Sequence, residues 1–176
     1  DHRDLHSFPT RRSSDLENGF AIGYVKEQTE EMCIEAVRRV GLALEYVRNK
    51  TLKIYLEAVK QNGLALRHVE KKTNEICLAA VRQYGLALQY VNDKTDEICM
   101  EAVRQNGIAL QFVNNQTLEI CREAVKQDVT AINWIKNRKV FRIIIMEDWR
   151  VFEGIWKHVL ADGIMEMVVR SILRIP

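Results

Sequence analysis

The four cysteines are the residues best suited to chemistry in this sequence, because thiolates bind metals, form disulfides and act as nucleophiles. They are Cys33, Cys77, Cys99 and Cys121, and Tyr55 takes the same place once in a repeated pattern. Successive copies of a helical repeat stack about 10 Å apart, too far for a disulfide or a shared metal ion. No two cysteines form a CxxC pair. The pattern therefore predicts buried, reduced thiols that pack as small hydrophobic groups, with no metal site.

An aromatic position recurs with the same spacing and could stack bases or hold a peptide if it lined an open groove. We call its members the aromatic row: Tyr24, Tyr46, His68, Tyr90, Phe112 and Trp134. Valine or isoleucine follows each member, which favours packing in the core. His68 is then interpreted as an aromatic substitute, since the repeat arithmetic places no other histidine or carboxylate beside it.

Two rows of basic residues could track phosphates. The first row is Arg38, Lys60, Arg82, Arg104 and Lys126, and it is the candidate binding surface of the sequence. The second row is Lys50, Lys72, Lys94 and Arg138. The first row lies in the last turn of a predicted helix, and most of its members follow a glutamate by three residues, namely Glu35, Glu57, Glu101 and Glu123. This arrangement favours a solvated face whose charges pair internally.

Signatures of common enzymes are absent from the sequence. There is no phosphate-binding glycine loop, no nucleophile elbow and no HExxH motif. Glu147, Asp148 and His158 are titratable residues for which the pattern supplies no partner. The chain is therefore expected not to be an enzyme and to need no cofactor.

The chain realigns with itself at a constant step of 22 residues. Glycines mark the step at Gly19, Gly41, Gly63, Gly85 and Gly107. Each glycine opens a run such as GLALEYV, and each run leads to a threonine at Thr29, Thr51, Thr73, Thr95 or Thr117. A segment such as DEICMEAVRQN follows each threonine. Five aligned copies without an insertion predict a tandem-repeat protein.

Each copy is predicted to form two helices joined by a turn. Threonine is a good helix N-cap, and the glycine after the first helix is predicted to close it as a left-handed C-cap. Ile98, Cys99, Ala102 and Val103 lie on one face of such a helix, and that face must be buried. Helices this short are not stable alone. The prediction is an all-α fold, an α-solenoid of about five 22-residue helix-turn-helix repeats with a divergent helical C-terminal segment.

The N-terminal end of the chain departs from this pattern. Residues 1–16 have no helical or strand periodicity, and they resemble a translated sequencing adapter of the kind found in metagenomic genes. We interpret them as an artefact or a disordered tail and exclude them from the fold. The natural protein is then expected to carry further sequence before Glu17.

The C-terminal end departs as well. Residues 17–137 are predicted to form the repeats, but the sixth copy has Val129 in place of the glycine and Lys139 in place of the threonine. Residues 138–176 are interpreted as a divergent helical cap. The alternative is that a frameshift near residue 137 produced this tail.

Two segments carry a family resemblance. EAVRQNGIALQFV and AAVRQYGLALQYV resemble the repeat known as domain of unknown function 4116, which large DNA viruses, protists and some bacteria encode. The resemblance covers about residues 17–137. It departs where the family usually has alanine and this chain has valine, at Val25, Val47, Val69, Val91 and Val113. It implies a repeat fold and brings no established activity.

A non-catalytic module for protein–protein interaction is the first functional hypothesis, because solenoids expose extended surfaces. The alternatives are a nucleic-acid-binding repeat array, or the repeat arm of a larger enzyme or effector. A partner would be read by positions that differ between copies: Gly23, Glu45, Arg67, Gln89 and Gln111, or Glu30, Leu52, Asn74, Asp96 and Leu118. The sequence contains no signal peptide and no apolar stretch of about 18 residues, so an intracellular, cytoplasmic protein without membrane contact is expected.

Overall fold

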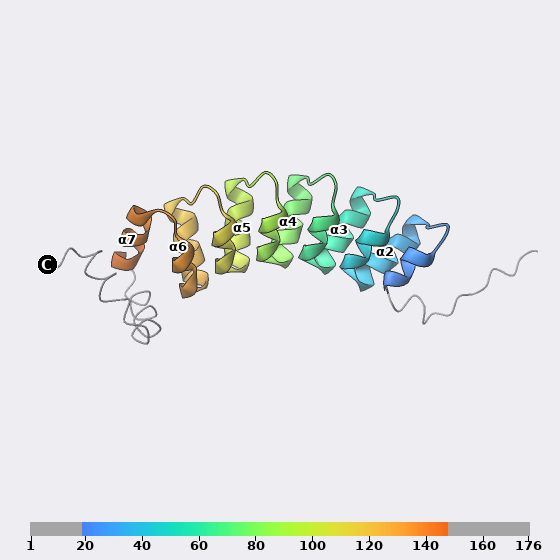
Figure 1. The fold of residues 1–176 in the computed structure, drawn as a ribbon, viewed down its shortest axis with the longest axis horizontal. Coiled ribbons are helices and arrows are strands. Elements are labelled where there is room, and N and C mark those ends of the chain that lie inside the picture. Colours follow the sequence, from blue (N-terminus) through green and yellow to red (C-terminus); the bar gives the residue numbers. More distant parts are fainter. Residues whose placement is uncertain (1–18, 148–176) are drawn as a thin grey trace, which may run out of the picture. The chain divides into compact units, whose positions relative to one another are not determined.

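The computed structural model describes residues 19–147, and these form α-helices and 3-10 helices without a strand. Ten-residue α-helices alternate with six-residue 3-10 helices (Figure 1). The α-helices are α2 (Glu30–Arg39), α3 (Leu52–Gln61), α4 (Asn74–Gln83), α5 (Asp96–Gln105), α6 (Leu118–Gln127) and α7 (Arg138–Glu147). The 3-10 helices are η1 (Gly19–Tyr24), η2 (Gly41–Tyr46), η3 (Gly63–His68), η4 (Gly85–Tyr90), η5 (Gly107–Phe112) and η6 (Val129–Trp134). Residues 1–16 and most of the predicted C-terminal cap lie outside the described range.

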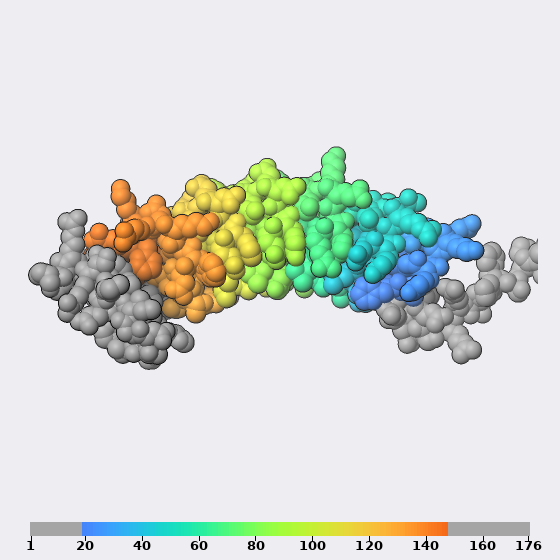
Figure 2. All heavy atoms as spheres, in the orientation of Figure 1, coloured from blue at the N-terminus to red at the C-terminus, as the bar shows by residue number. Residues whose placement is uncertain are grey.

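The chain divides into two compact units at Gln83 and Tyr84. In unit 1, α3 packs on α2 and α4 and on the 3-10 helices η2 and η3. In unit 2, α5 packs on η4, η5 and α6, and the 3-10 helices η4, η5 and η6 pack in chain order. Atoms of successive repeats within a unit abut in the space-filling view (Figure 2). The predicted all-α repeat fold, of the α-solenoid class, is confirmed within each unit.

The threonine N-caps are confirmed. In α3 the hydroxyl of Thr51 accepts a hydrogen bond from the Ile54 amide at 3.4 Å. The same bond forms at Thr29, Thr73, Thr95 and Thr117. Each bond satisfies one of the free amides in the first turn, so the polar threonine fixes where each of these α-helices begins.

The second helix of each repeat is a 3-10 helix. In η2 the amide of Ala43 donates to the Val40 carbonyl at 2.9 Å, and the amide of Val47 donates to the Leu44 carbonyl at 3.3 Å. A 3-10 helix has three residues per turn, so residues three apart lie on the same side. Gly41, Leu44 and Val47 have this spacing and are all buried. The tighter helix therefore suits a six-residue segment whose apolar residues recur at every third position.

The core lies between the two kinds of helix. Ile98, Cys99, Ala102 and Val103 of α5 are at most 2% exposed, as their helical spacing predicts. The equivalent residues of α3, α4 and α6 are also buried, and the described part of the chain contains no buried polar or charged residue. The same pattern of apolar burial thus recurs from α3 to α6, so none of these four repeats holds a separate core.

Close packing, and not backbone handedness, explains the repeated glycines. The helix α2 ends at Arg39, its C-cap residue Val40 is extended with φ of −140°, and Gly41, which follows, has no positive φ. A Cβ atom on Gly41 would lie 2.5 Å from the carbonyl oxygen of Ala58 and 2.8 Å from Oε1 of Gln61, both in the next repeat. The prediction of a left-handed glycine C-cap is therefore wrong. Glycine is needed because the end of the neighbouring helix occupies the space of a side chain.

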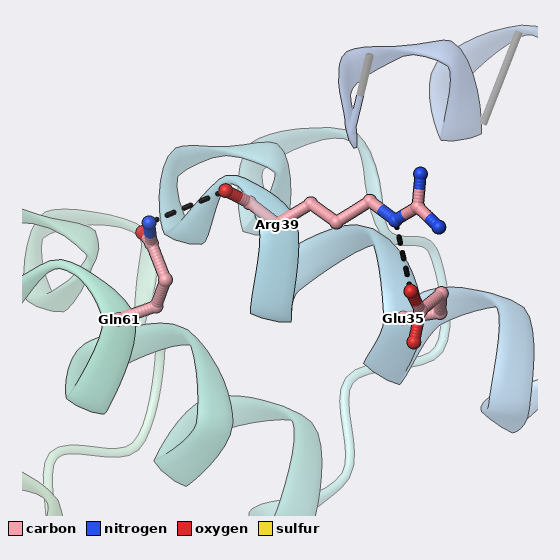
Figure 3. Close-up of polar contacts among 3 residues, drawn as sticks. All are labelled: Glu35, Arg39 and Gln61. Atoms are coloured by element: carbon pink, nitrogen blue, oxygen red, sulfur yellow. Dashed lines mark hydrogen bonds and ion pairs between the residues drawn. The ribbon is translucent and has the colours of Figure 1, made fainter. Parts of the chain in front are cut away.

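A glutamine of the next repeat fills the remaining space beside each of four glycines. The amide of Gly41 donates to Oε1 of Gln61 at 2.6 Å, and Nε2 of Gln61 donates to the carbonyl of Arg39 at 3.2 Å (Figure 3). Gln83, Gln105 and Gln127 accept in the same way from Gly63, Gly85 and Gly107. We call this contact the glycine–glutamine clasp. It joins one repeat to the next wherever it forms within a unit.

The last described helix, α7, is capped by asparagine and not by threonine. The repeat predicts that α7 begins after Lys139, but it begins at Arg138. Oδ1 of Asn137 accepts from the amides of Lys139 and Val140 at 2.9 and 3.5 Å. Asparagine is as good an N-cap as threonine. The cap is therefore present, two residues earlier than the repeat pattern places it.

We expect Gly41→Ala to destabilise the protein by about 1–3 kcal/mol, because the new Cβ cannot avoid a backbone oxygen. Gly23→Ala is the matched control, since its Cβ would meet the Tyr46 side chain at 3.2 Å, and that ring can move. Thermal unfolding followed by far-UV circular dichroism should show a clearly lower Tm for Gly41→Ala alone. Equal melting of the two variants would contradict the close-packing explanation.

Candidate binding surface

The first basic row lies on the exposed side of the α-helices, where several members already pair with glutamates. Nε of Arg38 donates to Oε2 of Glu57 in the next repeat at 2.6 Å. This hydrogen bond lowers the pKa of Glu57. Arg104 lies 3.2 Å from Glu101 of its own helix and 3.9 Å from Glu123 of the next. The prediction of internal pairing is confirmed at these positions.

Arg104 pairs with Glu101 as the sequence predicts, but the partner of Arg38 differs from the predicted one. Arg38 bonds across the repeats, while Glu35, three residues before it, pairs with Arg39 at 2.8 Å (Figure 3). Lys60 and Lys126 are exposed, and no ion pair of theirs is found in residues 19–147. The row is therefore a mixture of paired guanidinium groups and solvated ammonium groups.

Lys50, Lys72 and Lys94 of the second basic row occupy a half-buried loop position, whereas Arg138 is exposed at the start of α7. The side chain of Lys50 is 17% exposed and lies 3.7 Å from Glu70. Gln116 occupies the equivalent position later in the chain, and its Nε2 donates to the carbonyls of Leu110 and Trp134 at 3.1 and 2.9 Å. The position joins a loop to two successive 3-10 helices. The low exposure of the Lys50 side chain leaves it poorly placed to bind phosphate.

The aromatic row lies at the surface, contrary to the prediction of core packing. Tyr24 is 81% exposed, Tyr46 46% and Trp134 43%. His68, Tyr90 and Phe112 are half-buried. In η2, η3, η4 and η5 the first, third, fourth and seventh positions are buried, whereas the second, fifth and sixth are not. The hydrophobic alternation in the sequence does not distinguish this 3-10 arrangement from an α-helix.

Apolar and variable residues flank the aromatic row. Leu86 and Ile108, the second residues of η4 and η5, are half-buried, and in unit 1 Phe20 packs edge-to-face on Tyr46 with ring centroids 6.0 Å apart. The fifth positions, which the sequence marks as variable, are Gly23, Glu45, Arg67, Gln89 and Gln111, with Asn133 following in η6. We call the second, fifth and sixth positions of the 3-10 helices the 3-10 surface. In each unit it is a partly apolar surface whose polar residues change from repeat to repeat.

His68 has charged neighbours that the repeat arithmetic does not reveal. Its Nε2 accepts a hydrogen bond from Nε of Arg67 at 2.7 Å and lies 3.8 Å from Oε2 of Glu45. Burial lowers the pKa of His68, and the charge of Arg67 adds to this shift. The expectation that no carboxylate lies near His68 is therefore wrong. A neutral imidazole fits the site, because a protonated ring could not accept from the guanidinium.

The other variable set lies in the first turn of the α-helices. Glu30 accepts a hydrogen bond from the hydroxyl of Thr51 at 2.8 Å, and Leu52 is 50% exposed. Its remaining members are Asn74, Asp96 and Leu118. This set contains no aromatic side chain.

The cysteines are buried free thiols, as predicted. Cys33, Cys77 and Cys99 are 2% exposed, and Cys121 is fully buried. Burial raises the pKa of Cys121 to about 11 and also raises the pKa values of Cys33 and Cys99. Within residues 19–147 no group of cysteine, histidine and acidic side chains has the arrangement of a metal site. Thiols that are both buried and protonated are poor nucleophiles.

No helix in the described range combines the length and apolar character that crossing a bilayer demands.

We expect the stability of the protein to fall as the pH rises from about 9 to about 11. Unfolding returns the pKa of Cys121 from about 11 to 9.0, so the unfolded chain loses this proton first. The stability that Cys121 contributes is complete below pH 9 and is lost as the pH rises through its folded-state pKa of about 11. In Cys121→Val, which keeps a similar volume, the Tm should decline less over this range. An unchanged slope in thermal melts would refute a titrating role for Cys121.

Comparison with known proteins supplies the family. The family model described as "Domain of unknown function (DUF4116)" matches residues 51–95, 75–118 and 95–138, which together span half of the 176-residue chain. Comparisons with curated proteins and with solved structures found no match. The matched segments contain capping threonines, clasp glycines and part of the 3-10 surface. The chain belongs to the family of domain of unknown function 4116 proteins.

Proposed function

We propose that this chain is a non-catalytic module that binds another protein through its 3-10 surface. The observation that carries the proposal is the exposure of the aromatic row. Tyrosine and tryptophan supply large contact areas with few rotatable bonds, and they are enriched where proteins bind one another. Tyr46 and Trp134 are each more than two-fifths exposed. Aromatic side chains that recur at the surface in successive repeats favour a partner that covers them.

The variable fifth positions support the same proposal. They stand directly beside the aromatic row, and they carry Glu45 and Arg67 in unit 1 but Gln89 and Gln111 in unit 2. The buried positions of these repeats hardly differ. Variation limited to the surface can alter which partner is bound without disturbing the stack.

Nucleic acid is the weaker candidate. Arg38 and Arg104 are already bonded to glutamates, and Lys50 is largely buried. A phosphate ligand would have to compete with these carboxylates for the guanidinium groups. Lys60 and Lys126 are the exposed cations of the first row for which a phosphate contact requires no such competition.

Absence of catalysis is part of the proposal. The buried thiols have raised pKa values, which disfavours nucleophilic attack. His68 accepts a hydrogen bond from Arg67, and this bond occupies the ring nitrogen that a general base would use. These features support a binding role over an enzymatic one.

Selection of peptides from a random display library on the full chain tests the proposal. We expect enriched peptides whose affinity falls about tenfold or more in Phe112→Ala, because aromatic side chains at the centre of an interface dominate its energy. Lys126→Ala on the α-helical side is the control and should bind with unchanged affinity. Fluorescence anisotropy with the selected, labelled peptides measures both.

Two outcomes would overturn the proposal. The first is enrichment of peptides whose binding is lost in Lys126→Ala and retained in Phe112→Ala. The second is failure to enrich any peptide, together with binding of a single-stranded oligonucleotide at low salt that Lys60→Ala and Lys126→Ala abolish.

A further inference from the structure

The 3-10 surface of unit 2 carries hydrogen-bond acceptors held in one orientation. Nε2 of Gln89 donates to the carbonyl of Leu86 at 3.2 Å, and Nε2 of Gln111 donates to the carbonyl of Ile108 at 3.2 Å. A backbone carbonyl oxygen only accepts hydrogen bonds, so it pairs with the nitrogen of the glutamine side chain and not with its oxygen. These bonds therefore fix which way each side-chain amide is turned. Within the described residues, Oε1 of Gln89 and Oε1 of Gln111 have no donor. Asn133 has the same place in η6 and is exposed.

The acceptors lie beside aromatic side chains in a surface that contains no cation at its second, fifth or sixth positions. Tyr90, Phe112 and Trp134 directly follow the three amide residues in the chain. In the loop after η6, Lys136 donates its Nζ to the carbonyl of Val113 at 2.9 Å. The surface is thus neutral, rich in acceptors and flanked by rings. It suits a ligand that offers N–H donors and apolar side chains, and it does not suit phosphate or carboxylate groups.

The spacing of the repeats limits which backbone conformation such a ligand can have. Packed helices lie about 8–10 Å apart, and η4, η5 and η6 pack in chain order. A polyproline II helix has three residues per turn and rises about 3.1 Å per residue, so the same side recurs about every 9 Å. It makes no internal hydrogen bonds, which leaves its N–H groups free. A β-strand repeats its side every second residue, at about 7 Å, and does not match.

We infer that unit 2 binds a polyproline II segment whose every third residue is not proline. This inference rests on the proposed protein-binding function and names its ligand. The N–H groups of the non-proline residues donate to Oε1 of Gln89 and Gln111. Proline rings pack on the aromatic side chains, as they do on the aromatic residues of domains that bind this conformation.

Synthetic peptides test the inference with the full chain. Fluorescein-labelled (Pro-Pro-Leu)4 presents an N–H at every third residue, (Pro-Leu)6 presents one at every second residue, and dodecaproline presents almost none. We expect (Pro-Pro-Leu)4 to bind at least about tenfold more tightly than dodecaproline, and more tightly than (Pro-Leu)6, in fluorescence anisotropy. Gln89→Leu and Gln111→Leu should each weaken its binding several-fold, as the loss of one acceptor predicts. Lys126→Leu is the matched control and should have no effect.

The outcomes separate this inference from the proposed function. Equal affinity for the three peptides, or insensitivity of (Pro-Pro-Leu)4 binding to both glutamine variants, would overturn the inference. The protein-binding function would still stand if library peptides bound in a manner that depended on Phe112. If one glutamine variant lost its helical circular dichroism, peptide binding by the other variant would test the inference, because Gln89 and Gln111 lie in different repeats.

Discussion

The glycine–glutamine clasp is the contact on which the stacking of the repeats depends. At Gly41 the backbone lies so close to the next helix that a Cβ would touch the Ala58 carbonyl, and Gln61 satisfies the amide that this approach would otherwise leave without a partner. A close approach without the hydrogen bond would bury an unpaired donor, at a cost of about 1–3 kcal/mol. Glycine and glutamine therefore recur together because each residue makes the other one necessary.

The clasp also determines what the second helix of each repeat can be. Its first residue is held against the neighbouring repeat, and the chain must turn into the loop soon after. A 3-10 helix covers that distance with Gly41, Leu44 and Val47 on its inner side. Tyr46, the sixth residue, is 46% exposed, although Ala43 three residues before it is fully buried.

The repeat period, the threonine caps and the buried face of the α-helices could all be predicted from the sequence, because each depends on local chemistry that recurs every 22 residues. The role of Gly41 and the position of Tyr46 could not. A glycine after a helix is compatible with both a left-handed cap and a close approach, and the two differ only in contacts with a residue of the next repeat. Likewise, the hydrophobic pattern of GLALEYV fits an α-helix and a 3-10 helix equally well, and it does not reveal that Tyr46 is exposed. The Glu45–His68 proximity has the same origin in contacts between repeats.

The two sides of each repeat differ in whether their polar groups are satisfied. On the α-helical side Arg38 meets Glu57, and Arg104 meets Glu101 and Glu123, so much of the charge is neutralised within the unit. On the 3-10 side the side-chain nitrogens of Gln89 and Gln111 donate to backbone carbonyls. Their side-chain oxygens are left to hydrogen-bond with water, and a half-buried aromatic residue follows each glutamine in the chain. Water can donate hydrogen bonds to those oxygens, but the rings remain apolar surface in contact with water. A ligand that replaces water at both gains apolar burial without losing hydrogen bonds, and this makes the 3-10 side the favourable one for binding.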